Sequence, residues 1–175
     1  MDAYIEQSGL GHILAKVRKG ERLTLEDGRT LYHHPNILAL GYLANIVRER
    51  QNGNQAFFIY NQHINYSNIC TNLCKFCAFG KEKGHALAYE MSVEDVKNKV
   101  RQRLDEPISE IHMVGGIHPD LPFSYYIDLL RGIKEVRPEV HIQAFTCVEI
   151  HHLAQLAGKS VDQTLRDMVD AGLGS

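Results

Sequence analysis

The stretch Cys70-Thr-Asn-Leu-Cys-Lys-Phe-Cys77, a C-x3-C-x2-C run, decides how this sequence is interpreted. It holds three of the chain's four cysteines, Cys70, Cys74 and Cys77, in a short polar loop. Three thiolates at this spacing can bind three irons of a 4Fe–4S cluster, which leaves the fourth iron without a protein ligand. Because an open coordination position is where a metal site receives substrate, the run predicts a catalytic cluster.

Other thiol and metal chemistries fit the run less well. Electron-transfer ferredoxins use four cysteines at other spacings. A structural zinc site needs four ligands, usually from paired C-x2-C motifs, so a Cys3His site stays open only with His63 or His85 as the fourth ligand. Disulfides within so short a loop would strain the S–S geometry, and free thiols favour the reducing cytoplasm.

Composition argues against several classes of partner. A chain of 175 residues with 44% hydrophobic residues can build a core. The net charge of −2, with Lys and Arg scattered along the chain, gives no reason to expect nucleic acid. The N-terminal residues do not resemble a signal peptide, and no apolar run approaches the length of a bilayer span. We therefore expect a cytoplasmic protein with no nucleic-acid and no membrane partner.

Residues 1–54 are predicted to form a helical segment. Leu10, Ile13, Leu14 and Val17 follow helical spacing. Thr24-x-x-Asp27 has the form of a capping box that opens a second helix, which the next proline must end.

Residues 55–175 are predicted to alternate strands with helices. Strands are expected at 55–65, 110–114 and 140–146, and helices after Ser92, over 126–136 and after Ser160, each separated by turn or capping residues. Three such units in series indicate an α/β fold with a parallel sheet. In parallel sheets chemistry gathers at the carboxyl ends of the strands, where the cysteine run, Gly115-Gly116 and Glu149 all fall.

The cysteine run resembles the motif of the radical S-adenosylmethionine (SAM) enzymes, C-x3-C-x-aromatic-C, with Phe76 at the aromatic position. Longer strings are similar to the radical SAM enzymes of the futalosine route to menaquinone, in particular the aminodeoxyfutalosine (aminofutalosine) synthase family. The strings are His63-Ile-Asn-Tyr-Ser-Asn-Ile-Cys70, Cys74-Lys-Phe-Cys-Ala-Phe79, Met113-Val-Gly-Gly-Ile-His-Pro-Asp120 and Gln143-Ala-Phe-Thr-Cys-Val-Glu-Ile150.

This resemblance implies the N-terminal part of a radical SAM partial (β/α)6 TIM-like barrel, preceded by a helical segment and continued by further strands after Ser175. It implies that Cys70, Cys74 and Cys77 bind the cluster and that the open iron binds SAM. Phe76 would lie near the SAM adenine, although an aromatic side chain that only packs the loop onto the barrel is an equal alternative.

The resemblance also gives roles to the other strand ends. Gly115 and Gly116 would let exposed backbone bind the methionine end of SAM, against the alternative of a plain tight turn. Glu149 would accept hydrogen bonds from the SAM ribose or from the substrate, or it would be a first-turn helix residue stabilised by the helix dipole. His112 and Gln143 face the barrel mouth only if strand parity allows it, and Cys147 is expected to be a buried free cysteine.

The activity implied is a radical SAM transferase that adds the 5′-deoxyadenosyl group of SAM, used as co-substrate, to 3-[(1-carboxyvinyl)oxy]benzoate, an enolpyruvyl benzoate. An electron donor such as flavodoxin or ferredoxin is implied as partner. We do not expect residues 1–175 alone to be active, and no catalytic acid or base is identified. The alternatives are cyclic dehypoxanthine futalosine cyclase, a deazaflavin-cofactor synthase subunit, or more remotely a zinc or iron–sulfur module without SAM chemistry.

Overall fold

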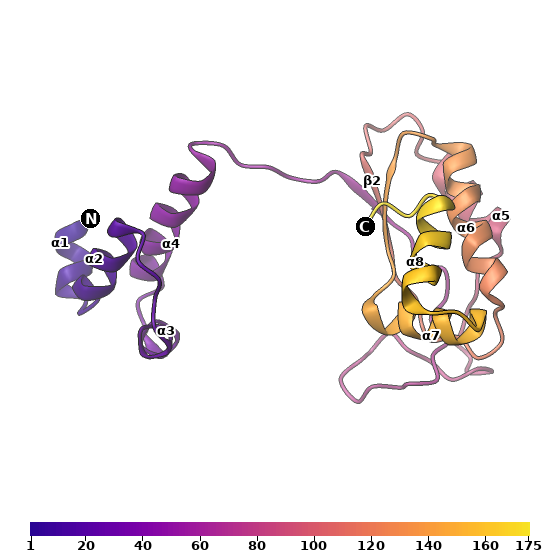
Figure 1. Cartoon of the computed structure of the whole chain (residues 1–175), viewed down its shortest axis with the longest axis horizontal. Helices are drawn as coiled ribbons and strands as arrows, with labels where there is room; N and C mark the ends of the chain where they lie inside the picture. The colour runs from indigo at the N-terminus through magenta and orange to yellow at the C-terminus, as the bar shows by residue number, and fades with distance from the viewer. The chain divides into compact units, whose positions relative to one another are not determined.

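The computed structural model describes residues 1–175, which divide into two compact units, Met1–Phe58 and Ile59–Ser175 (Figure 1). Each unit has a hydrophobic core of its own. No helix in either unit combines the length and the apolar character needed to cross a bilayer.

Helices make up the first unit: α1 (Asp2–Gln7), α2 (Gly11–Lys19), α3 (Leu25–His33) and α4 (Ile37–Asn52). The predicted apolar stripe is buried on α2, where Ile13, Leu14 and Val17 pack into the core of the unit. The first helix was not predicted, because six residues are too short for the helical period to show.

The predicted capping box of α3 is present in both directions. The Thr24 hydroxyl accepts from the Asp27 amide (3.2 Å), and Asp27 Oδ2 accepts from the Thr24 amide (2.8 Å). Lys16 Nζ lies 2.7 Å from the same carboxylate oxygen. Hydrogen bonds from Lys16 and then Thr24 hold the pKa of Asp27 well below its usual range. The cap therefore joins α3 to α2 through a charge.

Three strands and four helices make up the second unit: β1 (Asn61–His63), α5 (Val93–Arg101), β2 (Glu110–Met113), α6 (Phe123–Val136), β3 (His141–Ala144), α7 (Cys147–Ala157) and α8 (Val161–Asp170). The strands are parallel in the order β1-β2-β3, with Gln62 opposite Ile111 and Ile111 opposite Ile142. The predicted α/β fold with a parallel sheet is confirmed.

The two faces of this sheet differ in chemistry. Ile111, Met113 and Ile142 are fully buried in the core that the helices share. The alternate residues His112 and Gln143 lie opposite each other on the other face, which is more polar and more exposed. This alternation follows from the period of two along a strand, and it fixes the parity that the sequence left open.

The first predicted strand is wrong in its length, because only Asn61–His63 of residues 55–65 form a strand. The apolar side chains before it are exposed, with Phe57 at 81% and Phe58 at 85%. The strand β2 begins only at Glu110, so the backbone before Tyr60 has no strand to pair with. An apolar run needs a paired neighbour as well as β propensity to become a strand.

The capping carboxylate of α3 gives a prediction about pH. Because the folded-state pKa of Asp27 is lowered, its stabilisation is present above the unfolded value of about 3.9 and is lost as the pH falls through the folded value. We expect Asp27→Ala to lower the melting temperature at pH 7, and to lower it by less near about pH 2, where the carboxyl is protonated in the unfolded chain. Thermal unfolding followed by far-UV circular dichroism checks this.

The control is Asn36→Ala, which removes the uncharged cap of α4, where Asn36 Oδ1 accepts from the Ala39 amide at 3.1 Å. It should cost about 1 kcal/mol at both pH values. An Asp27→Ala effect of equal size at both pH values would contradict the assignment.

Candidate functional site

The cysteines lie in the long connection between β1 and α5, and the base of this loop is tied back on itself. The Cys70 amide donates to the Lys81 carbonyl (2.9 Å), and the Lys81 amide donates to the Asn68 carbonyl (2.8 Å). In Figure 1 this connection and α7 lie at the same end of the second unit. The base of the cysteine loop is therefore held by backbone hydrogen bonds at the ends of the strands.

The three cysteines of the loop differ in exposure. Cys70 is half-buried, whereas Cys74 and Cys77 are exposed and close a tight turn in which the Cys77 amide donates to the Cys74 carbonyl (2.9 Å). Cys70 Sγ accepts from the Ile117 amide and Cys77 Sγ from the Gly80 amide, both at 3.4 Å. Two of the three sulfurs are thus already oriented by N–H groups of the chain.

The donor set fits an iron–sulfur cluster. Hydrogen bonds from the amides of Gly80 and Phe79 lower the pKa of the Cys77 thiol, which favours the thiolate that binds metal. Thiolates are the ligands of such clusters, and hydrogen bonds to sulfur tune them. No three His, Cys, Asp or Glu side chains are close enough to hold a metal ion in the present arrangement. Cluster binding therefore requires the thiols to come closer together than they lie here.

The histidines weighed as a fourth zinc ligand are engaged elsewhere. His63 Nε2 lies 2.7 Å from Asn65 Oδ1, and the His63 ring lies 5.0 Å from that of His112. His85 Nδ1 accepts from the Leu87 amide at 3.0 Å. Neither histidine joins the cysteines in a group of metal-binding side chains.

Gly116 packs directly against the base of the cysteine loop. Its amide donates to the Ser67 carbonyl (3.1 Å). A Cβ at this position would overlap the Ile69 carbonyl oxygen and would lie 2.9 Å from the Cβ of Cys70. Only glycine allows this approach, so the identity of residue 116 is fixed by its contact with the cysteine loop.

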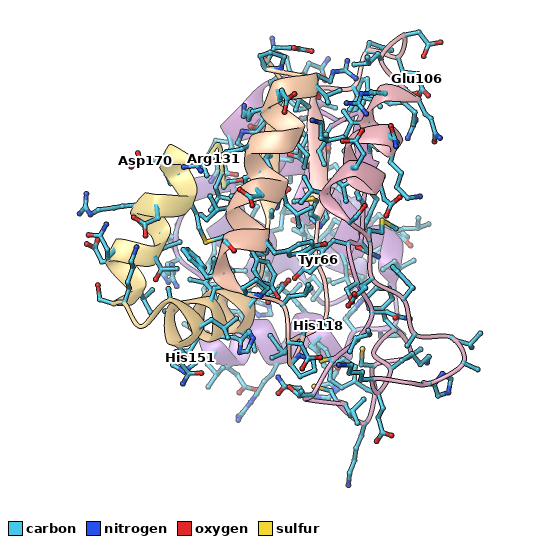
Figure 2. The ribbon with its side chains drawn as sticks, turned by 90° about the vertical axis from the view of Figure 1, so that its right-hand side faces the viewer. Tyr66, Glu106, His118, Arg131, His151 and Asp170 are labelled. Carbon is cyan, nitrogen blue, oxygen red and sulfur yellow. The ribbon has the colours of Figure 1, made fainter.

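Gly115 makes a similar contact with an aromatic ring. A Cβ on Gly115 would overlap the ring of Tyr66, which is fully buried between the loop and the helices. Figure 2 shows Tyr66 near the middle of the second unit, with His118 below it. Both glycines of the turn therefore have a packing reason within the chain, which the sequence alone did not reveal.

Glu149 lies in the first turn of α7, as one of its two expected placements stated. Thr146 is the N-cap, and its amide donates to Glu149 Oε2 (2.7 Å). Glu149 Oε1 accepts from the Tyr66 hydroxyl (2.8 Å) and from the Gly115 amide (3.0 Å). The residue is 3% exposed, so its carboxylate is directed at the protein.

Phe76 and Cys147 are both exposed. Phe76 is 95% exposed, so it does not pack the loop onto the sheet, which was the alternative to an adenine contact. Cys147 was expected to be buried, and that expectation was wrong. It is the first residue of α7, at the helix end next to the strand edge.

The polar residues near the strand ends serve two different purposes. His112 Nδ1 lies 3.3 Å from Gln143 Oε1, so the two side chains share one face of the sheet. His118 is buried, and its Nδ1 accepts from the amides of Asp120 and Leu121 (3.1 and 3.2 Å). Its Nε2 contacts the Glu90 carboxylate at 2.8 Å without hydrogen-bond alignment. His118 therefore holds the turn after β2 and is not presented to a ligand.

Sequence reasoning missed Tyr66, and it gave the helix that carries Glu149 only as one of two alternatives for that residue. The helix had a readable signal, because Thr146-x-x-Glu149 is a capping box of the same form as that of α3. Tyr66 had none, because its partner lies 83 residues further along the chain.

Comparison with known proteins places these features in a family. The model of the radical SAM superfamily matches residues 64–174, from the end of β1 to the end of the second unit. The chain belongs to the radical SAM superfamily. The motif that suggested this family and the fold that it implied are both confirmed.

Three curated relatives cover most of this chain. Aminodeoxyfutalosine synthase from Streptomyces coelicolor is 43% identical over 91% of the chain, and that from Thermus thermophilus is 39% identical over 92%. Cyclic dehypoxanthine futalosine synthase from Halalkalibacterium halodurans is 35% identical over 93%. The chain spans 41%, 43% and 44% of the lengths of these relatives, respectively.

Solved structures agree on the fold. Methylornithine synthase (PylB) matches with a TM-score of 0.60 at 20% identity, over 91% of this chain and 56% of that one. The hydrogenase maturase HydG from Carboxydothermus hydrogenoformans matches with a TM-score of 0.62 at 19% identity, over 96% of this chain and 47% of that one. The parallel sheet and its helices are thus part of a TIM-like radical SAM barrel.

The contact of Gly116 gives a testable prediction. We expect Gly116→Ala to push the loop base away from the turn and to expose Cys70, because the added methyl group overlaps the Ile69 carbonyl. Alkylation of Cys70, measured by mass spectrometry, should accelerate relative to that of the exposed Cys147.

Gly41→Ala is the matched control, since nothing lies within 4 Å of a Cβ at that helical position. It should leave Cys70 labelling unchanged and stabilise α4 by about 0.5–1 kcal/mol. Equal Cys70 labelling in Gly116→Ala and the wild type would show that the loop does not depend on this contact.

Proposed function

We propose that this chain is part of a radical SAM transferase that adds the 5′-deoxyadenosyl group of SAM to 3-[(1-carboxyvinyl)oxy]benzoate and forms aminodeoxyfutalosine, with release of methionine and loss of the enolpyruvyl carboxylate as bicarbonate. The observation that supports it is the three-cysteine loop, held at the end of the first parallel strand by a glycine turn. The named relatives at 43% and 39% identity support the choice of reaction. Because the chain spans less than half the length of these relatives, the activity is proposed for the whole protein.

Cys70, Cys74 and Cys77 would supply three thiolate ligands, and the cluster and SAM, when bound, supply the adenosyl radical chemistry. The amides of Ile117 and Gly80 would keep their hydrogen bonds to two of the sulfurs. These bonds would orient the thiolates and stabilise their negative charge.

The remaining predicted contacts surround the same loop. The backbone of Gly115 and Gly116 would receive the methionine end of SAM; because their amides already donate to Glu149 and to the Ser67 carbonyl, their carbonyl oxygens would accept from the SAM amino group. Phe76 follows Lys75 in the loop tip, and its exposed ring is free to lie against the adenine. Glu149, expected at the ribose, is already fully engaged within the chain.

The proposal includes an electron donor of the flavodoxin or ferredoxin class and a reducing, cytoplasmic location, where free thiols persist. The cyclase reaction is the second candidate, because cyclic dehypoxanthine futalosine synthase is 35% identical over nearly the same residues. A deazaflavin-cofactor synthase subunit is the third, because FO synthase from Streptomyces avermitilis is 36% identical over 88% of the chain.

The cysteine assignment is tested by substitution in the whole protein, reconstituted anaerobically with iron and sulfide. We expect a brown protein with one 4Fe–4S cluster that cleaves SAM. Replacing Cys70, Cys74 or Cys77 with Ala should abolish both the cluster and the cleavage of SAM, because each substitution removes one of the three ligands. Cys147→Ala is the matched control and should retain the cluster. Iron and sulfide content with visible absorption measures this, and loss of the cluster in Cys147→Ala would falsify the ligand assignment.

The reaction itself is tested by the product. We expect the enolpyruvyl benzoate to be converted to a product that contains the deoxyadenosyl carbon atoms. Free 5′-deoxyadenosine should not accumulate in an amount equal to the product. Mass spectrometry distinguishes this from the cyclase reaction, which would release free 5′-deoxyadenosine. Turnover of dehypoxanthine futalosine, and none of the benzoate, would assign the protein to the cyclase.

A further inference from the structure

One buried carboxylate joins the carboxyl ends of all three strands. Tyr66 follows β1, Gly115 follows β2 and Thr146 follows β3. Each donates a hydrogen bond of 2.7 to 3.0 Å to the Glu149 carboxylate. Hydrogen bonds to an ionised, buried acceptor are stronger than those between neutral groups.

Both oxygens of this carboxylate are occupied. Oε1 accepts from Tyr66 and Gly115, and Oε2 accepts from the backbone of Thr146. Burial first, and the charge of Glu149 second, raise the pKa of Tyr66 well above its ordinary value, so the phenol remains a donor. A ribose hydroxyl would have to displace one of these donors from a site that is 3% exposed.

The Gly115–Gly116 turn is held in position by its contacts with Glu149, Tyr66 and the loop base. The Tyr66 ring leaves no room for a Cβ on Gly115, and the Ile69 carbonyl leaves none on Gly116. The turn is therefore held from one side by the hydrogen bond to Glu149 and from the other by the loop that carries Cys70. A shift of the carboxylate would move the turn.

We propose that Glu149 and Tyr66 are positioning residues, which fix the Gly115–Gly116 turn where its backbone receives the methionine end of SAM, and that Glu149 does not bind SAM itself. This inference rests on the proposed radical SAM function. Tyr66 acts through Glu149, and Glu149 acts through the amide of Gly115.

The first test uses the chain without cluster or SAM. Tyr66→Phe keeps the ring against Gly115 and removes only the hydroxyl. Hydrogen exchange of the Gly115 amide should accelerate about tenfold or more, because the carboxylate loses one fixed donor and moves.

Tyr125→Phe is the matched control. Its ring lies 6.2 Å from that of Tyr66 in the same aromatic cluster, but its hydroxyl donates to the Met91 carbonyl at 2.6 Å. It should leave Gly115 exchange unchanged. Equal exchange in both variants would overturn the proposal.

The second test measures SAM binding to the reconstituted whole protein, from the change that SAM makes in the electron paramagnetic resonance spectrum of the reduced cluster. Tyr66→Phe should retain full iron content and bind SAM about tenfold more weakly. Combining it with Glu149→Ala should weaken binding no further than Glu149→Ala alone, because the two residues act in series. Glu149→Gln keeps the oxygen that faces Tyr66 and Gly115 and should recover part of the loss.

The outcomes separate the competing roles. Weaker SAM binding in Glu149→Ala with wild-type binding in Tyr66→Phe would assign Glu149 to SAM and overturn the proposal. Lower melting temperatures with unchanged SAM binding would make the pair purely structural and would also overturn it. A wild-type protein that binds no cluster or SAM would instead refute the proposed function, whereas the exchange experiment would still decide whether the carboxylate positions the turn.

Discussion

In the second unit, the ends of the strands are joined by hydrogen bonds to one charged group, the Glu149 carboxylate. A carboxylate that is withdrawn from water costs folding free energy unless each of its oxygens receives hydrogen bonds, and Glu149 finds its donors only at the ends of three strands. Since the strands are parallel, those ends meet at one edge of the sheet, where the first turn of α7 can reach them all. The Glu149 side chain therefore both caps α7 and links the ends of the three strands. The candidate site and the hydrogen bonds to Glu149 thus lie at the same edge of the sheet, the carboxyl ends of the strands.

Local patterns predicted local structure well. The capping boxes at Thr24 and Ser92 both open the helices expected of them, since their partners lie three residues apart. The same pattern is present at Thr146, where a helix was expected only as one of two alternatives for Glu149. The apolar run before Tyr60 was taken for a strand, because its residue types suit a strand and the missing pairing partner cannot be seen in one segment. The bond between Tyr66 and Glu149 spans 83 residues, and no local pattern encodes it.

The two glycines of the turn are explained differently by the sequence motif and by the structure. From sequence, Gly115 and Gly116 suggested room for a ligand. In the structure each lies against the chain's own atoms, Gly115 against the ring of Tyr66 and Gly116 against the backbone of Ile69. A role for the turn in binding a ligand would therefore involve its carbonyl groups, because both amides already donate within the chain. The resemblance to the family singled out these two glycines, and the packing explains why no other residue type fits there.

The same contacts divide the cysteine loop into a fixed base and an open tip. Cys70 belongs to the base, where its amide is bonded to Lys81 and its sulfur to the Ile117 amide. Cys74 and Cys77 belong to the tip, which is exposed and held mainly by its own tight turn. Within the tip, the Cys77 sulfur accepts from the Gly80 amide, so the sulfurs of Cys70 and Cys77 are both oriented by N–H groups of the chain. The loop base packs against Gly116, so the turn that is hydrogen-bonded to Glu149 is also in contact with the half-buried Cys70.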